Sequence, residues 1–153
     1  MIYIYLLRYN NNILFIGVCF MSELERARQF FSKDLYATEA TGIVIESVGE
    51  KYAKCSLKLE RRHQNAVGAV MGGVMFTLAD FVFAVATNFE SESVTVTLVS
   101  QISYLSAVKG DTLYGESKLI KDGRNNCFYE IHITDNLGTA VATVAVTGAH
   151  LRK

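Results

Sequence analysis

The most constraining feature of this sequence is the segment from Val74 to Phe89, which is apolar on nearly every side. A helix of this kind is buried, and this one is too short and has too many polar residues to cross a membrane. A glycine-rich stretch, Asn65 to Gly73, leads into it. The rest of the chain must therefore wrap around this helix, since nothing else can cover it.

Strand patterns lie on both sides of the apolar segment. Before it, Gly42–Val48 and Tyr52–Leu59 are joined at Gly49-Glu50-Lys51, and the second of them alternates apolar and polar residues. After it, four strands are expected at residues 93–105, 111–121, 125–135 and 139–150. Turn signals such as Asp122-Gly123 separate these strands. The pattern predicts an α+β fold in which an antiparallel sheet of about six strands wraps around the long helix.

The first twenty residues are far more apolar than those that follow. A polar break splits them into two runs that are too short to span a bilayer, and they lack the features of a secretory signal. Ser22 and Glu25 have the spacing of a capping box, which predicts a short helix over Glu23–Lys33. We expect a domain of residues 21–153 preceded by an extension of residues 1–20; a short membrane-seeking anchor is the competing interpretation.

The composition, the net charge and the cysteines exclude several classes of protein. Half of the 153 residues are hydrophobic and 20% are charged, which suits one folded domain and argues against disorder. With 15 basic and 15 acidic residues, the chain is not built to coat nucleic acid or an anionic membrane. The three cysteines are far apart and form no CxxC pair, which favours a reducing, cytoplasmic setting.

Asp80 is the only Asp, Glu, Lys or Arg between residues 63 and 89. Burying a lone carboxylate costs several kcal/mol unless it is paired or hydrogen-bonded. Thr77, Asp80, Ala84 and Thr87 fall on one helical stripe, so Asp80 faces the least apolar side. Two interpretations stay open: the stripe is a solvent edge with an ordinary surface acid, or Asp80 is a functional carboxylate.

Gly72 and Gly73 lie at the expected helix start, where unpaired amides and the helix dipole favour negative charge. Glycines allow a ligand to approach the backbone closely. An acid two turns further on can attack, or activate water against, a carbonyl that these amides polarise. The alternative is a tight turn without a ligand.

Other chemistries find little support in the sequence. The motifs of a nucleophile elbow, a P-loop, a dinucleotide-binding loop and an H-E-x-x-H metal site are absent. His63, His132 and His150 are isolated, which favours satisfied polar residues over metal ligands, and clusters of Cys, His and Asp at ligand spacing are missing. Cys55 and Cys127 alternate with apolar strand residues and are interpreted as core packing.

The run HQNAVGAVMGGVMFTLAD, from His63 to Asp80, resembles the signature of the PaaI-like acyl-CoA thioesterases of the hotdog fold. The similarity covers most of residues 35–150 and continues through 84–88, 102–105, 110–113, 122–124 and 139–150. The resemblance implies a curved sheet around a central helix, a homodimer or homotetramer with active sites between subunits, and a hydrolase. It also implies that no cofactor or metal is needed, because water is the second substrate.

The same resemblance suggests roles for four residues. Asp80 matches the catalytic carboxylate, acting as base or nucleophile, and Gly72 matches the residue whose amide binds the thioester oxygen. Asn65 matches a loop residue that positions water or substrate. Thr97 matches a hydroxyl contributed by the partner subunit, and it shares the polar face of its strand with Thr95; an ordinary strand threonine is the alternative.

The sequence departs from the family pattern at two places: Met71 stands where His is frequent, and Ser106 where a Pro follows the Tyr-Leu pair. We expect hydrolysis of a small or aromatic acyl-CoA, without nucleic-acid partners or stable membrane association. Expected substrate contacts are Gly73, Met71, His63, Lys121 and Arg124, with Arg152 as a further cation for the phosphates. The alternative is a non-catalytic acyl-CoA-binding or regulatory hotdog domain, and a hotdog hydratase is a weaker third.

Overall fold

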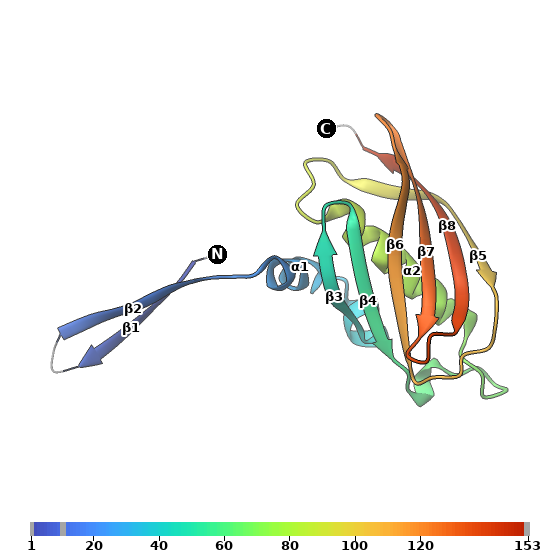
Figure 1. Cartoon of the computed structure of the whole chain (residues 1–153), viewed down its shortest axis with the longest axis horizontal. Coiled ribbons are helices and arrows are strands. Elements are labelled where there is room, and N and C mark those ends of the chain that lie inside the picture. Colours follow the sequence, from blue (N-terminus) through green and yellow to red (C-terminus); the bar gives the residue numbers. More distant parts are fainter. Residues whose placement is uncertain (1, 10–11, 152–153) are drawn as a thin grey trace.

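A six-stranded antiparallel sheet curves around the long helix α2, Gly72–Asn88, as the computed structural model shows (Figure 1). The structure describes residues 2–9 and 12–151. The strand order is β3-β4-β6-β7-β8-β5, and each neighbouring pair is antiparallel. The strands are β3 Ile43–Gly49, β4 Tyr52–Lys58, β5 Thr95–Tyr104, β6 Thr112–Asp122, β7 Asn126–Asp135 and β8 Ala140–His150. The predicted α+β fold and its six strands are therefore confirmed.

Helix α2 supplies the centre of the core. Its inward side chains are buried: Met75, Leu78, Ala79, Phe81, Val82, Phe83, Val85 and Ala86. The β6 backbone passes close to the helix at Gly115, where an added Cβ would lie 3.0 Å from Val82 Cγ2 and 3.1 Å from Leu78 Cγ. A larger residue at this position would push the sheet away from the helix.

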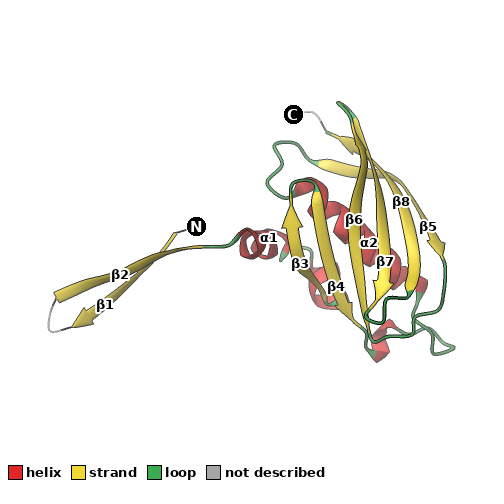
Figure 2. Ribbon diagram, in the orientation of Figure 1, coloured by secondary structure: helices red, strands yellow, loops and turns green. Residues whose placement is uncertain are grey.

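Three shorter helical segments complete the wall around α2 (Figure 2). Helix α1, Glu23–Phe31, begins with the predicted capping box, in which Ser22 and Glu25 satisfy each other's free backbone amides. Its Phe31 ring packs edge-on against Phe81 of α2 at 5.7 Å. The π-helical segment η1, Tyr36–Thr41, and the 3-10 turn η2, Arg61–His63, flank β3 and β4.

The segment before α1 forms a separate two-stranded antiparallel sheet, β1 Ile2–Tyr9 and β2 Asn12–Phe20. Figure 1 shows this hairpin extending away from the six-stranded sheet. Within the described ranges 2–9 and 12–151, no helix has both the length and the hydropathy that a membrane span requires.

Strand β5 is one edge of the sheet and pairs with β8, not with β6, its successor in the chain. Its register with β8 shifts between Thr97 and Val99. Such a bulge twists a strand and redirects its side chains. Apolar side chains on and beside this edge are exposed, namely Val94, Val96, Leu98 and Val99.

Candidate active site

The loop before α2 is held by Asn65. Its Oδ1 accepts hydrogen bonds from the backbone N–H groups of Val67 (3.1 Å) and Ala69 (3.0 Å), and its own N–H donates to the Ala69 carbonyl. The Met71 N–H donates to the His63 carbonyl at 2.9 Å and closes the loop. These contacts fix the chain where it enters the helix.

Helix α2 begins at Gly72, with Met71 at the N-cap and no side-chain cap. The first N–H groups of a helix have no acceptor within the helix, and the positive end of its dipole lies there. The Tyr104 ring covers this end so closely that a Cβ at residue 72 would lie 2.5 Å from its hydroxyl oxygen. Glycine at this position therefore leaves the first amides of α2 accessible beside an aromatic ring.

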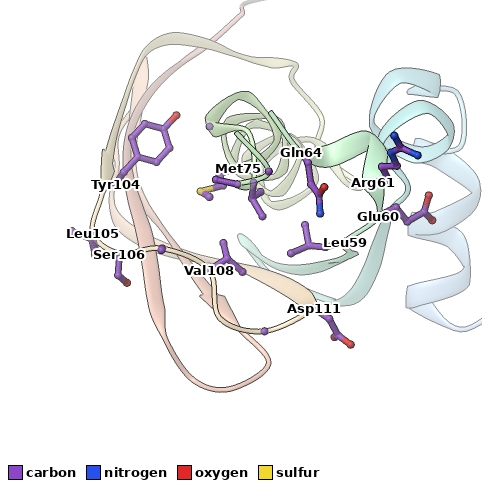
Figure 3. A pocket seen from close by; sticks show the side chains of 16 residues that line it. Leu59, Glu60, Arg61, Gln64, Met75, Tyr104, Leu105, Ser106, Val108 and Asp111 are labelled. Carbon is purple, nitrogen blue, oxygen red and sulfur yellow. The ribbon is translucent and has the colours of Figure 1, made fainter. Parts of the chain in front are cut away.

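A cavity of about 830 Å³ opens next to Gly72 (Figure 3). Its lining is mainly apolar and comes from residues 59–64, 68–75 and 104–111; it includes Leu59, Val70, Met75, Tyr104, Leu105 and Val108. Asp111 lies at its rim, and hydrogen bonds from Lys58 Nζ and then from Thr112 Oγ1 lower the pKa of its carboxyl below the ordinary value. The cavity therefore offers a mainly apolar surface beside the start of the helix.

Asp135 anchors the loop that forms one side of this cavity. It is 3% exposed, and its two carboxylate oxygens accept four backbone hydrogen bonds, from Lys109, Gly110, Leu137 and Thr139. Burial raises the pKa of this carboxyl, but these donors outweigh burial and hold its pKa well below the usual range.

Asp80 lies on an exposed face of α2, in the protomer as described. In a single protomer this agrees with a solvent edge, and the role of Asp80 as a functional carboxylate stays a prediction. The stripe of Thr77, Asp80, Ala84 and Thr87 is the less buried side of the helix, as the sequence predicts. The helix is buried by its other faces, so the cost of burying a lone charge does not arise here.

Thr97 Oγ1 donates a hydrogen bond to Asp80 Oδ1 at 3.3 Å, within one chain. The resemblance suggested Thr97 as a contribution of the partner subunit, and within one protomer it lies beside Asp80 of its own chain. The bulge in β5 after Thr97 turns this side of the edge strand toward α2.

Gly72 and Asp80 of one chain are too far apart to act on the same carbonyl. They are eight residues apart on one helix, which separates them by about 12 Å along its axis. Reacting atoms must approach to about 3–3.5 Å. A single protomer therefore contains the two halves of the predicted site but does not bring them together.

A second hollow, of about 320 Å³, lies beside Asp80. Its apolar walls come from Leu35, Tyr36, Phe81 and Ala84. Leu35 and Tyr36 are exposed although both are large and apolar, which is unusual unless a ligand or partner covers them. The sequence analysis missed these two residues because nothing in their local pattern links them to Asp80, which is 44 or more positions away.

The remaining predicted substrate contacts divide into two groups. Gly73 and Met71 lie at the start of α2 and are exposed. His63 is 3% exposed and both ring nitrogens are engaged: Nδ1 accepts from the Glu60 N–H, and Nε2 bonds the Thr41 carbonyl. Both ring nitrogens of His63 thus hold neighbouring backbone, and the ring does not line the cavity beside Gly72.

Lys121 and Arg124 lie at the β6–β7 turn, at the opposite end of the sheet from Gly72 in the same chain (Figure 1). Both are exposed. They do not line the cavity beside Gly72 in their own protomer. Arg152 lies outside the described residues.

Three potential metal ligands that are far apart in the sequence lie together in the structure. The strands bring Asp122, Cys127 and His150 together, with ligand atoms within 4.8 Å of one another. These residues are up to 28 positions apart, so no linear spacing reveals them. The only signal was the expected hairpin at Asp122-Gly123, whose register sets Asp122 opposite Cys127.

Comparisons with known proteins agree with this architecture. Residues 67–142 match the model of the thioesterase superfamily. Human acyl-coenzyme A thioesterase 13 is 28% identical over 114 residues, which cover 72% of this chain and 78% of the human protein. The acyl-coenzyme A thioesterase PaaI of Escherichia coli is 26% identical over 118 residues, covering 77% and 84% of the two chains.

Solved structures show the same fold. The E. coli PaaI structure superposes with a TM-score of 0.73 at 26% identity, covering 86% of this chain and 97% of PaaI. A hypothetical thioesterase of Streptococcus pneumoniae, solved with coenzyme A, gives a TM-score of 0.71 at 25% identity, covering 82% and 98%. The residues that match the family model include α2 with Gly72 and Asp80, the strands β5, β6 and β7, and the first three residues of β8. By its sequence and its fold, the chain is therefore similar to the thioesterase superfamily, and its relatives and structural neighbours support a thioester hydrolase of the PaaI-like hotdog group.

Proposed function

We propose that this protein hydrolyses an acyl-CoA thioester at a site shared by two copies of the chain. One copy provides Asp80 and Thr97, and the other provides the Gly72 amide and the Asn65 loop. The observation that carries the proposal is the distribution of these groups within one protomer. Asp80 contacts Thr97 directly, whereas the helix itself separates Asp80 from Gly72 by about 12 Å.

The exposed apolar edge of β5 supports this assembly. A sheet edge with free backbone groups and apolar side chains such as Leu98 and Val99, which are 57% and 61% exposed, is a surface that a second strand can cover. Thr97 lies on this edge strand, so a twofold contact along β5 brings Asp80 and Thr97 of one copy next to the other copy. The proposed assembly is a homodimer, or a homotetramer built from such dimers.

In the proposed reaction the Gly72 N–H donates to the thioester carbonyl oxygen as negative charge develops on it. Asp80 takes a proton from water while the water oxygen bonds to the carbonyl carbon. When the carbonyl re-forms, the C–S bond breaks, and CoA leaves as a thiolate that takes up a proton. As a nucleophile, Asp80 would instead bond to the carbonyl carbon; the C–S bond then breaks, CoA leaves as a thiolate that takes up a proton, and water hydrolyses the resulting anhydride to the free acid and the Asp80 carboxylate.

The hollow beside Asp80 favours a small or aromatic acyl group. Leu35, Tyr36 and Phe81 provide an apolar surface directly next to the carboxylate, within a volume of about 320 Å³. The coenzyme A in the S. pneumoniae relative supports the CoA half of the substrate. Lys121 and Arg124 remain proposed contacts of the CoA phosphates. Because they are remote from Gly72 of their own chain, they would contact substrate bound at the site of the partner copy.

Asp80→Asn tests the proposal. We expect turnover of a panel of acyl-CoA thioesters, followed by thiol release, to fall by about 10²–10⁴-fold, the usual contribution of a general base. Coenzyme A binding and the melting temperature should be unchanged. Glu92→Gln, which removes an exposed acid on the loop before β5, is the matched control and should turn over normally.

Undiminished hydrolysis by Asp80→Asn would remove Asp80 from the mechanism. A wild-type protein that binds acyl-CoA but turns over no member of the panel would favour a non-catalytic acyl-CoA-binding or regulatory domain. Met71 is the observation behind that alternative, because its thioether cannot donate the hydrogen bond that a histidine would at the start of α2.

We also propose that residues 21–153 form the catalytic domain and residues 1–20 an extension to it. The support is that β1 and β2 pair with each other in a sheet of their own, and that the Ser22 capping box starts α1 without them. A chain beginning at Met21 should keep the melting temperature and the kcat of the full chain. A lower melting temperature or a lower kcat would show that the β1–β2 hairpin is part of the catalytic domain.

A further inference from the structure

At the end of the sheet remote from Gly72, three potential metal ligands lie together. Asp122 is opposite Cys127 across the β6–β7 hairpin, and Cys127 is opposite Gly148 on β8. His150 is two residues beyond Gly148, so its side chain lies on the same face of the sheet as those of Asp122 and Cys127. Their ligand atoms lie within 4.8 Å of one another.

Gly148 keeps the space between Cys127 and His150 free of a side chain. A Cβ at this position would lie 2.9 Å from Cys127 Sγ and 2.6 Å from the Phe83 ring. Cys127 is 1% exposed, so its sulfur faces the interior. The thiol therefore lies over the glycine, at the inner side of the cluster.

Two atoms of the cluster that would not bind the metal, His150 Nδ1 and Asp122 Oδ2, form hydrogen bonds with other residues. His150 Nδ1 forms a 2.8 Å hydrogen bond with Thr95 Oγ1, whose residue is 5% exposed, and this leaves Nε2 pointing at Asp122 Oδ1, 2.9 Å away. Lys51 Nζ donates to the other oxygen, Asp122 Oδ2, at 2.6 Å. Metal-bound histidines are oriented in this way, through a hydrogen bond from the ring nitrogen that does not bind the metal.

The separations suit a tetrahedral ion after small side-chain rotations. With bonds of about 2.0–2.3 Å, ligand atoms around such an ion lie roughly 3.3–3.8 Å apart. One imidazole nitrogen, one thiolate and one carboxylate oxygen form a donor set typical of zinc. Asp122, His150 and Thr95 also line a cavity of about 540 Å³, which provides an entry path and room for a fourth ligand such as water.

We propose that Asp122 Oδ1, Cys127 Sγ and His150 Nε2 bind a divalent transition-metal ion of the zinc class. Binding takes neutral imidazole, carboxylate and thiolate, and the Cys127 thiol proton is released to solvent. The ion ties the β6–β7 hairpin to the end of β8, next to the start of β5. Within its own chain, the length of α2, about 25 Å for 17 residues, separates the ion from the Gly72 end of the helix, and the role assigned to it is to hold these strands together.

Titration of the full chain with Co²⁺ tests the site without any measurement of thioester hydrolysis. All proteins in the series carry Cys19→Ser, so that Cys55 and Cys127 are the remaining cysteines. The expected signals are a near-ultraviolet thiolate-to-cobalt charge-transfer band and the strong visible bands of tetrahedral Co²⁺. Zn²⁺ should displace the cobalt and raise the melting temperature.

The variants assign the ligands. Cys127→Ser should lose the charge-transfer band, and His150→Gln should weaken Co²⁺ binding at least tenfold. Thr95→Val keeps the shape of the side chain and removes the hydrogen bond to His150 Nδ1, so Co²⁺ should bind about 10–100-fold more weakly. Cys55→Ser is the matched control: Cys55 is also buried, but it lies in β4 and outside the cluster, so the band should persist.

The proposal is overturned if the wild-type background shows no charge-transfer band, or if Cys127→Ser keeps the band. Should Cys127→Ser fail to melt cooperatively, the other two variants decide. Co²⁺ binding by His150→Gln and Thr95→Val at wild-type strength would then refute the site.

Discussion

Two inactive variants of this protein are expected to restore activity when they share a dimer. Asp80→Asn removes the carboxylate, and Asn65→Ala removes the two hydrogen bonds that hold the loop before Gly72. As a homodimer, each variant should have a kcat at least about 10²-fold below that of the wild type. Asp80→Asn lacks the general base, and Asn65→Ala lacks a positioned oxyanion donor.

The size of the recovery follows from the arrangement of the site. Because Asp80 and Asn65 of one chain serve different sites, a mixed dimer places both substitutions in one site and leaves the other intact. A purified mixed dimer should therefore have about half of the wild-type kcat, since a twofold dimer has two equivalent sites. Relative to either parent, this is an increase of about 50-fold.

The assay uses the two variants co-expressed with different affinity tags, tandem purification of the mixed dimer, and thiol release from an acyl-CoA that the wild type turns over. A mixed dimer of wild type and Asp80→Asn defines the activity of one intact site. If the Asp80→Asn and Asn65→Ala mixed dimer stays as inactive as its parents while this control is half active, both groups act within one protomer. The helix-length reasoning would then be refuted.

The remaining predictions concern single substitutions. Thr97→Val should lower kcat by roughly tenfold or more, because a hydrogen bond to a charged group contributes about 1.5–3 kcal/mol; an unchanged kcat in the thiol-release assay would exclude Thr97 from positioning Asp80. Leu78→Ala should lower the free energy of unfolding by about 2–5 kcal/mol in urea, because Leu78 is fully buried, whereas the matched Leu137→Ala at an exposed turn should change it by less than about 0.5 kcal/mol. Asp135→Asn should lower the melting temperature most at neutral pH. The folded-state pKa of Asp135 is depressed, so its carboxylate stabilises the fold above the unfolded-state pKa of about 3.9 and loses that effect as pH falls toward the folded value. The difference in melting temperature between wild type and Asp135→Asn should begin to shrink below about pH 4 and continue to shrink as pH falls further, and a constant difference would contradict this assignment.

Local sequence patterns determined the elements of this protein. The apolar run that begins at Val74 predicts a buried helix. In the structure the helix begins two residues earlier, because Gly72 and Gly73 form its first turn. The alternation in Tyr52–Leu59 and the turn at Gly49-Glu50-Lys51 predict β3 and β4 almost to the residue. Ser22 and Glu25 predict the start of α1, since a capping box depends only on residues three positions apart.

Tertiary structure alone decided which residues meet. Alternation shows that β5 has two faces, but only its place at the edge beside β8 decides that Thr97 turns toward α2 and that Leu98 and Val99 are exposed. Strand register likewise brings Asp122, Cys127 and His150 together over a separation of 28 residues. The periodicity of apolar residues shows which face of a helix or strand a side chain lies on. Contacts between distant strands depend on strand pairing and register, which no local pattern encodes.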